Sequence, residues 1–203
     1  MHSMGRVENS CWTRHDAEQH LRKSCSVMAR LIAQYGPCSL AEHEFNPFQT
    51  LVNSIISQQL SAKAANTIKH RLKAVVSDFA PAGFLAVSSE KLRVAGLSSA
   101  KARTIVELAK RVSDGRLNLE VTQNAPDADV IAKLVEIPGI GQWTAEMFLI
   151  FGLHRPNVLS LGDAGLQRAT RRLFGDNAKL ESVGSVWHPY CSVASWYLWR
   201  ALD

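Results

Sequence analysis

The residues best suited to chemistry are a glycine-rich turn, Pro138-Gly139-Ile140-Gly141, and a carboxylate farther along the chain, Asp163. In the turn, the proline ends one helical segment, and the two glycines permit positive φ and leave the backbone bare. The isoleucine between them can be buried. The amides of Gly139, Gly141 and Gln142 would then face outward at the start of the next helix, where N–H groups bind phosphate. The turn therefore predicts a phosphate-binding backbone, and a plain corner between two helices is the alternative.

The carboxylate at position 163 follows Gly162 and precedes a segment with helical periodicity, so it has two interpretations. As an N-cap, Asp163 would accept a hydrogen bond from a backbone amide in the first turn of that helix. As a reactive group, it could stabilise positive charge that develops on a substrate and orient an attacking water. One side chain can do both, and the residues themselves leave the two roles open.

The composition is that of an ordinary globular protein. The 203 residues suffice for one large domain or two small lobes, and the 46% of hydrophobic residues can build a sizeable core. The net charge of +5 and the pI of about 9.2 suit a polyanionic partner without proving one. No apolar run is long enough to span a membrane. Residues 1–12 lack the apolar stretch of a signal peptide, which predicts a flexible tail. The four cysteines are too widely spaced for a zinc or iron–sulfur site, so we expect no metal ligands.

Apolar residues recur at helical spacing along nearly the whole chain, which predicts an all-α fold. Capping residues and glycines place the expected helices at 16–34, after Asn46-Pro47, after Ser61, after Ser98 or Ser99, after Asp127, and at 143–151, 164–174 and 186–201. Residues 117–121 alternate as a strand does, but no partner strand is evident, so we expect an extended connection there.

Five motifs, in this order, resemble a known family. They are residues 55–61 (Ile-Ile-Ser-Gln-Gln-Leu-Ser), 96–102, the turn within 134–145, Leu161-Gly162-Asp163, and the block from Trp187 to Arg200. Together they resemble the helix–hairpin–helix superfamily of DNA glycosylases. Within it they are similar to the alkyl-base branch, the 3-methyladenine DNA glycosylase II type, in a short form without the N-terminal β-rich domain.

The resemblance implies a two-lobed helical fold with the active site in the cleft between the lobes. Residues 46–157 would form one lobe, which carries the hairpin, and residues 13–45 with 158–203 the other. Asp163 would be the catalytic residue at their junction, because breaking an N-glycosidic bond builds positive charge on the sugar. The implied partner is double-stranded DNA with damaged bases, bound by a monomer in the cytoplasm, at the nucleoid, or in the nucleus. No cofactor is expected, except that the hairpin could hold a monovalent cation.

Position 143 sets the reaction type that the resemblance implies. Family members that also cut the DNA strand carry a lysine there, which forms a Schiff base with the sugar. Trp143 has no amine, so we expect a monofunctional enzyme that leaves an intact abasic site. The indole could stack on an extruded cationic base, or it could simply pack in a core. Trp199 matches a second aromatic residue of the family's base pocket.

The resemblance also implies the DNA contacts. Base extrusion leaves a gap in the duplex, and the turn Gln58-Gln59-Leu60 matches the family's wedge, with Gln59 inserting and Leu60 as the alternative. A polar turn with a core leucine is the plain interpretation. The expected phosphate contacts are Gly139, Gly141, Gln142, Thr144 and Arg168. Arg168 shares one helix face with Arg171 and Arg172, which could equally be a solvated surface.

Three positions depart from the family pattern. Cys191 stands where an arginine is usual, Ser160 where a proline is frequent, and Met147 replaces a pocket aromatic. Substrate range could therefore differ from that of the best-known members. Two other functions stay open: a uracil or mismatch glycosylase on the same scaffold, and a DNA-binding protein that senses lesions without cutting. Asp163 argues against the last, because a carboxylate would repel DNA and binding alone does not need it.

Overall fold

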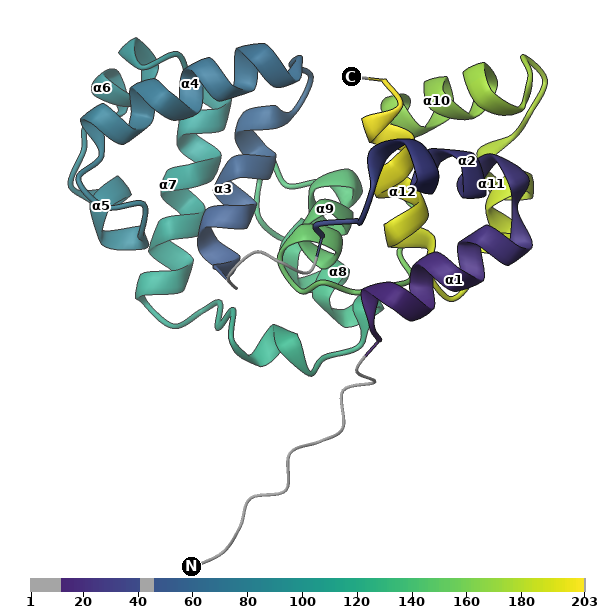
Figure 1. Cartoon of the computed structure of the whole chain (residues 1–203). Helices are drawn as coiled ribbons and strands as arrows, with labels where there is room; N and C mark the ends of the chain where they lie inside the picture. The colour runs from purple at the N-terminus through teal and green to yellow at the C-terminus, as the bar shows by residue number, and fades with distance from the viewer. Residues whose placement is uncertain (1–11, 41–45, 203) are drawn as a thin grey trace, which may run out of the picture. The chain divides into compact units, whose positions relative to one another are not determined.

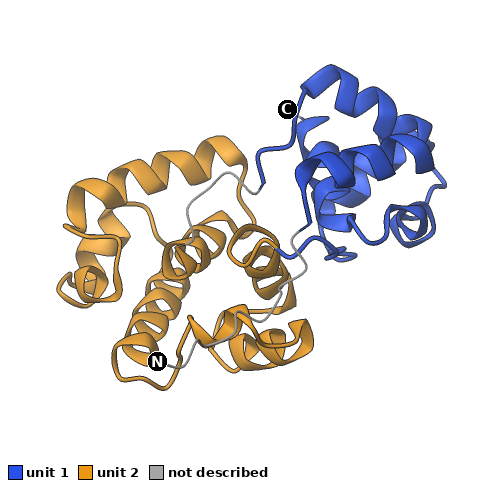
Figure 2. Cartoon of the chain, turned by 60° about the horizontal axis from the view of Figure 1, so that its bottom comes forward, with its two compact units in different colours: residues 1–43, 155–203 blue, residues 44–154 orange. Residues whose placement is uncertain are grey.

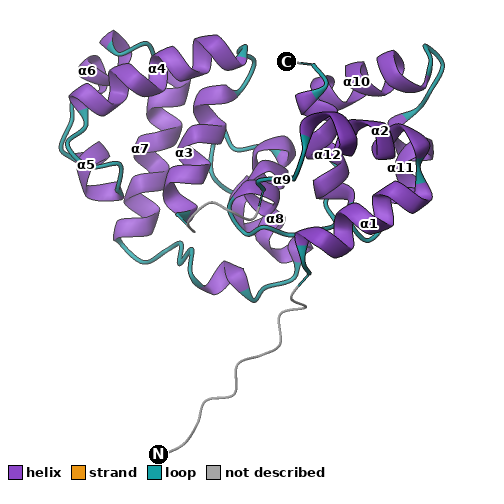
Figure 3. Cartoon of the chain, viewed as in Figure 1, coloured by secondary structure: helices purple, strands orange, loops and turns teal. Residues whose placement is uncertain are grey.

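The computed structural model describes residues 12–40 and 46–202, and within these ranges it contains helices and no strand (Figure 3). The expected tail, residues 1–12, lies outside the described residues except for Trp12. The chain divides into two compact units, Glu44–His154 and Met1–His43 with Arg155–Asp203 (Figure 2). The sequence predicts the corresponding boundaries at 46 and 157. None of the described helices is long and apolar enough to cross a membrane.

In the unit Glu44–His154, two helices, α3 (Pro47–Ser57) and α7 (Ser99–Ser113), make most of the contacts that join its elements. Its elements are α3, α4 (Ala62–Val75), α5 (Pro81–Leu85), α6 (Ser89–Val94), α7, the 3-10 turn η1 (Val121–Gln123), α8 (Asp127–Val135) and α9 (Gln142–Phe151). Helix α3 packs against α4, α7 and α9, and α7 also contacts α5 and α6 (Figure 1). Fully buried side chains such as Leu51, Ile55, Ile105 and Phe148 fill the space between them. This core fixes where α3 ends and where α9 begins.

The second unit is assembled from the two ends of the described chain. Its elements are α1 (Arg14–Ser24), α2 (Ser26–Tyr35), α10 (Ala164–Phe174), α11 (Leu180–Gly184), the 3-10 turn η2 (Ser185–Trp187) and α12 (Cys191–Arg200). Helix α12 contacts α1, α2 and α10. The largest fully buried side chains of this unit are Trp187 in η2 and Tyr197 in α12. The Tyr197 hydroxyl oxygen lies 3.0 Å from Glu18 Oε1 and 2.9 Å from the Gly36 carbonyl oxygen, and its single proton can be donated to either acceptor. These contacts join α12 to both N-terminal helices.

The predicted N-caps are confirmed for three helices. Asn46 caps α3 by accepting from the Gln49 amide at 3.0 Å, and Pro47 occupies the first turn. Ser61 caps α4 in the same way. Ser98, rather than Ser99, caps α7 through the Lys101 amide. Short polar side chains before apolar runs therefore located these helix starts correctly.

Three predicted elements are corrected by the structure. The helix expected over 16–34 is two helices, because Cys25 is extended (φ −151°) and interrupts the turn. The helix expected over 186–201 begins only at Cys191, since Pro189 has no N–H to continue a helix. Asp127 lies in the first turn of α8, and Pro126 is the N-cap of this helix. In the first turn, the helix dipole stabilises the Asp127 carboxylate.

The connection 117–121 consists of turns leading into η1. Its alternation reflects the burial of Leu117 and Leu119, not a strand.

Candidate functional site

The turn between α8 and α9, residues 136–141, is a tight hairpin closed by a hydrogen bond from the Ile140 amide to the Ile137 carbonyl at 2.9 Å. Ile140 is buried, as predicted. Only one glycine uses positive φ: Gly139 has φ 91°, whereas Gly141 has φ −102°. A Cβ on Gly139 would collide with the Thr104 hydroxyl, whereas a Cβ on Gly141 would meet nothing within 4 Å. Gly139 therefore serves the packing of the hairpin, and Gly141 leaves the start of α9 uncovered.

Side chains from α3 and α7 hold this hairpin by its carbonyl oxygens. Gln58 Nε2 donates to the Gly139 carbonyl at 3.0 Å and to Thr144 Oγ1 at 2.8 Å. Thr104 Oγ1 donates to the Pro138 carbonyl at 2.9 Å. Lys101 Nζ in turn donates to the Gln58 carbonyl at 2.7 Å, and partial burial lowers the pKa of this lysine. The hairpin is therefore attached to two other helices by hydrogen bonds.

Two predicted DNA-contacting residues take part in the packing of the hairpin. Gln58 was predicted as part of a wedge, but its amide is directed into the hairpin. Thr144 was predicted as a phosphate contact, but it is 1% exposed and its hydroxyl accepts from Gln58. Both side chains support the hairpin from within.

The rest of the predicted wedge lies on the surface. Gln59 is exposed and has φ 55°, an uncommon conformation for a residue with a side chain. Leu60 is 39% exposed, so the interpretation of Leu60 as a core residue is wrong. Two adjacent side chains at the end of α3 therefore project from the fold.

The start of α9 combines bare backbone with an aromatic ring. Gly141 is its N-cap and, among the described residues, no side chain caps it. Gln142 is exposed, and its Nε2 donates to Glu146 Oε1 at 2.9 Å, so this side chain follows the helix. Trp143 is half-buried in the first turn. The backbone amides at this helix start are the groups suited to an anion.

Asp163 is the N-cap of α10, and it is buried with 7% exposure. Its Oδ1 accepts two hydrogen bonds, from the Leu166 amide at 2.7 Å and from Trp199 Nε1 at 3.0 Å. The capping interpretation is therefore correct, and the structure places Trp199 directly beside the carboxylate. These two donors fix the orientation of the Asp163 carboxylate.

Gly165 makes this arrangement possible, and sequence reasoning did not single it out. A Cβ at this position would approach Asp163 Oδ1 at 3.0 Å and the Trp199 ring at 3.2 Å. Those distances are tighter than ordinary contacts, so a side chain would press on both partners. The available signal was a glycine in the first turn of a helix, where it has no conformational need.

A match to a family model now identifies the fold. The model of the HhH-GPD superfamily of base excision DNA repair proteins matches residues 52–184. The chain belongs to this superfamily. The match includes the hairpin, Trp143 and Asp163.

Two solved structures and one further relative agree with this HhH-GPD assignment. A crystal structure of a DNA-3-methyladenine glycosidase from Bacillus halodurans is 40% identical and covers 91% of this chain and 88% of its own, with a TM-score of 0.73. The Schizosaccharomyces pombe 3-methyladenine DNA glycosylase Mag1, in complex with abasic DNA, is 28% identical and covers 91% of this chain and 95% of its own, with a TM-score of 0.80. A Bacillus subtilis protein named putative DNA-3-methyladenine glycosylase YfjP is 31% identical over 79% of this chain, which spans 60% of that protein's length.

The arginines after Asp163 differ in their availability. Arg168 is exposed on α10. Arg172 Nη1 donates to the Ala201 carbonyl at 3.2 Å, which ties this side chain to the end of α12. Arg168 is therefore better placed to contact a ligand than Arg172.

The three departures from the pattern of this HhH-GPD family are all buried. Cys191 begins α12 and is fully buried, and this burial raises the pKa of the thiol to about 11. The carbonyl of Ser160 accepts from the Asp163 amide at 3.1 Å. Met147 lies in the core of its unit with 4% exposure. These residues fill cores and support the carboxylate instead of presenting groups on the surface.

Among the described residues, no cluster of three or more histidine, cysteine, aspartate or glutamate side chains could hold a metal ion. A monovalent cation at the hairpin would instead need carbonyl oxygens. Those of Pro138 and Gly139 already accept from Thr104 and Gln58. Each carbonyl oxygen keeps a second lone pair, so these oxygens are suitable ligands for such a cation.

Proposed function

We propose that this chain is a monofunctional DNA glycosylase that hydrolyses the N-glycosidic bond of alkylated bases of the 3-methyladenine type and leaves an abasic site. The observation that carries the proposal is Asp163, a buried carboxylate oriented by the Leu166 amide and the Trp199 indole. The membership of the HhH-GPD superfamily and the names of the relatives support it.

The reaction needs a group that stabilises positive charge. As the bond between base and C1′ breaks, its electron pair leaves with the base and the sugar becomes positively charged. Asp163 stabilises that charge, and the oxygen of a water molecule then forms the new bond to C1′. The water loses a proton to the carboxylate or to solvent. An alkylated cationic base departs as a neutral molecule, so it needs no dedicated general acid.

The absence of strand cleavage follows from Trp143. A lyase reaction begins with an amine that attacks C1′ and forms a Schiff base, and the indole side chain has no amine. We propose that its electron-rich face contacts the cationic base, since a cation over an indole is stabilised by about 0.5–2 kcal/mol.

DNA binding is assigned to exposed groups of both units. We propose that the backbone amides at Gly141 and Gln142 bind a phosphate, and that the Arg168 guanidinium binds another. Gln59 and Leu60 would occupy the gap left by the extruded base, because both project from the end of α3. Gln58 and Thr144 act indirectly by holding the hairpin.

Trp199 has a role in this proposal that differs from lining the base pocket. Its indole N–H holds Asp163 Oδ1 at 3.0 Å, so it positions the carboxylate. The hydrolysis as written uses water and a carboxylate alone, so we propose that the enzyme needs no cofactor. We further propose that it acts as a monomer where the cell keeps its DNA, in the cytoplasm or the nucleus.

The test is a panel of duplexes, each with one lesion: 3-methyladenine, 7-methylguanine, 1-methyladenine, 3-methylcytosine, hypoxanthine or uracil. We expect cleavage of alkylated duplexes only after alkali treatment, and none with Asp163→Asn, which keeps the oxygen that accepts both hydrogen bonds. Asp176→Asn, an exposed carboxylate of the same unit, is the matched control and should stay active.

Four results would contradict parts of the proposal. Strand cleavage without alkali would refute monofunctionality. An active Asp163→Asn protein would refute the catalytic assignment. Excision of uracil alone would replace the substrate class, and a folded wild-type protein inert on every lesion would favour a binding protein.

A further inference from the structure

Helix α4 carries an unusual set of charges. Its sequence, Ala62–Val75, contains three lysines, one arginine and one histidine, and no acidic residue. Four of its polar residues recur at the spacing i, i+3, i+4 and i+7, which places them on one face. They are Asn66, Lys69, His70 and Lys73.

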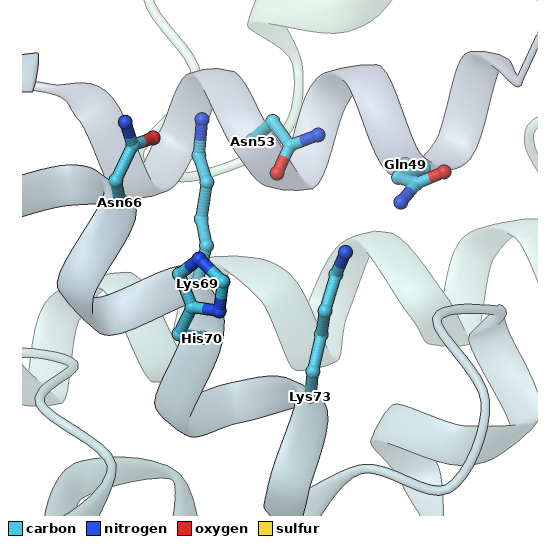
Figure 4. Close-up of a pocket in the computed structure, with 6 residues that line it drawn as sticks. All are labelled: Gln49, Asn53, Asn66, Lys69, His70 and Lys73. Atoms are coloured by element: carbon cyan, nitrogen blue, oxygen red, sulfur yellow. The ribbon is translucent and has the colours of Figure 1, made fainter.

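This face of α4 borders a groove against α3. The six residues lining the groove are Gln49, Asn53, Asn66, Lys69, His70 and Lys73, and none of them is acidic. Figure 4 shows the Lys69 and Lys73 side chains extending from α4 toward α3, with the Asn53 amide between them. The hollow measures about 180 Å³. Since a water molecule occupies about 30 Å³ in the liquid, a tetrahedral oxyanion fits.

The charged form of Lys69 is disfavoured in the absence of an anion. Lys69 is half-buried, and burial together with the nearby Lys73 lowers its pKa. Among the described residues, neither lysine forms an ion pair within 4.0 Å. Two like charges directed at one hollow without a carboxylate are stabilised when an anion enters it.

We propose that this α3–α4 groove binds a phosphate group. Lysine ammonium groups bind phosphate as point charges, whereas planar carboxylates favour the fork of arginine. The amides of Gln49, Asn53 and Asn66 add neutral donors around the two charges. The groove therefore combines positive charge, hydrogen-bond donors and enough space for a phosphate group.

The groove is separate from the contacts proposed for the lesion. None of its lining residues is among those assigned to the lesion. On α3, Gln49 and Asn53 precede Ser57, the last residue of the helix, by eight and four residues, which corresponds to about 12 and 6 Å at 1.5 Å per residue. The phosphate could come from the DNA backbone beyond the lesion or from free phosphate. The first source rests on the proposed function, and the second does not.

The first arm of the test uses inorganic phosphate and ¹⁵N-labelled full-length protein. We expect phosphate, added against chloride at equal ionic strength and pH, to shift the amide signals of Asn53, Lys69 and Lys73 saturably. The Lys69→Gln/Lys73→Gln protein should lose these shifts. The matched control, Arg71→Gln/Arg93→Gln, removes the same charge from exposed positions of the same unit outside the groove and should keep them.

The second arm measures binding of a long undamaged duplex against salt concentration. Each phosphate contact contributes about 0.9 to the slope of log affinity against log salt. We expect the groove variant to reduce the slope by about 0.9 and the control variant to leave it unchanged. Binding of undamaged DNA does not depend on Asp163, so this result is separate from the glycosylase assay.

The outcomes divide as follows. Localised phosphate shifts with an unchanged DNA slope support the groove and identify free phosphate as its ligand. A reduced slope specific to the groove variant supports it with DNA as the source, whether or not free phosphate saturates. If neither arm separates the groove variant from the control, the proposal is overturned. Melting temperatures of both variants exclude unfolding as the cause, and failed glycosylase activity with positive binding would refute only the proposed function.

Discussion

The hairpin and the Asp163 site are built in opposite ways. In the hairpin, the groups suited to a ligand are backbone amides. The Gln58 and Thr104 side chains donate to the hairpin carbonyls, and Lys101 donates to the Gln58 carbonyl. At Asp163 the group suited to chemistry is a side chain, and a backbone amide and the Trp199 indole hold it. We therefore expect substitutions at the hairpin to alter DNA affinity and the free energy of unfolding, and substitutions at Asp163 to alter the rate of base excision.

The largest expected effect comes from Asp163. Asp163→Asn and Asp163→Ala should both lower the single-turnover excision rate about 1000-fold, a loss at the upper end of that seen when one charge-stabilising group is removed. Only Asp163→Ala should destabilise the protein, by about 1 kcal/mol, because it also removes the N-cap. Rates and urea unfolding of both variants measure this. Equal unfolding free energies would show that the cap contributes nothing.

The two hairpin glycines should respond differently. Gly139→Ala should lower the free energy of unfolding by about 1–3 kcal/mol, because φ is 91° and the new Cβ collides with Thr104. Gly141→Ala should leave stability unchanged and weaken DNA binding, since its Cβ would point into open space at the start of α9. Unfolding and duplex-binding curves test this pair, and reversed effects would contradict the assigned roles.

Gln58 tests whether the hairpin is held from behind. Gln58→Met keeps the size of the side chain but leaves the Gly139 carbonyl and Thr144 hydroxyl without this donor. We expect a loss of about 1–3 kcal/mol in unfolding free energy and weaker DNA binding. The excision rate at saturating protein should stay within about twofold of wild type, because Asp163 is untouched. Gln34→Met, exposed in α2, is the control. A fall in the saturating rate that is specific to Gln58→Met would contradict the claim that the hairpin acts on binding and stability alone.

The smallest expected effect concerns Trp199. Trp199→Phe removes the donor to Asp163 but keeps an aromatic ring. It should lower the saturating rate about tenfold, near the low end of the effect expected when a hydrogen bond to a charged group, worth about 1.5–3 kcal/mol, is lost. Affinity for abasic DNA should not change. Trp196→Phe, on the same helix, should leave both unchanged. An affinity loss with an unchanged rate would return Trp199 to a role in lining the base pocket.

Local features of the structure could be predicted from the sequence. The caps at Asn46, Ser61 and Ser98 depend on neighbouring residues only, and so does the burial of Ile140 between two glycines. The breaks at Cys25 and before Cys191 were missed because apolar periodicity continues through them.

Contacts between distant segments could not be predicted. Gln58 lies 81 residues from Gly139, and Asp163 lies 36 residues from Trp199. No local pattern encodes either pairing. The sequence therefore indicated the hairpin, the carboxylate and the indole, but the hydrogen bonds that orient them required the fold.

The backbone character of the hairpin has a consequence for genetics. Alanine scanning replaces side chains, so it cannot delete the amides at the start of α9. Apart from Gly141→Ala, which covers these amides, a scan of residues 136–142 would report on the scaffold of the hairpin. An ester bond introduced by chemical ligation at position 142 would remove one N–H while preserving the side chain. Such a backbone substitution cannot be encoded by a codon change. It would measure directly how much this amide contributes to phosphate binding.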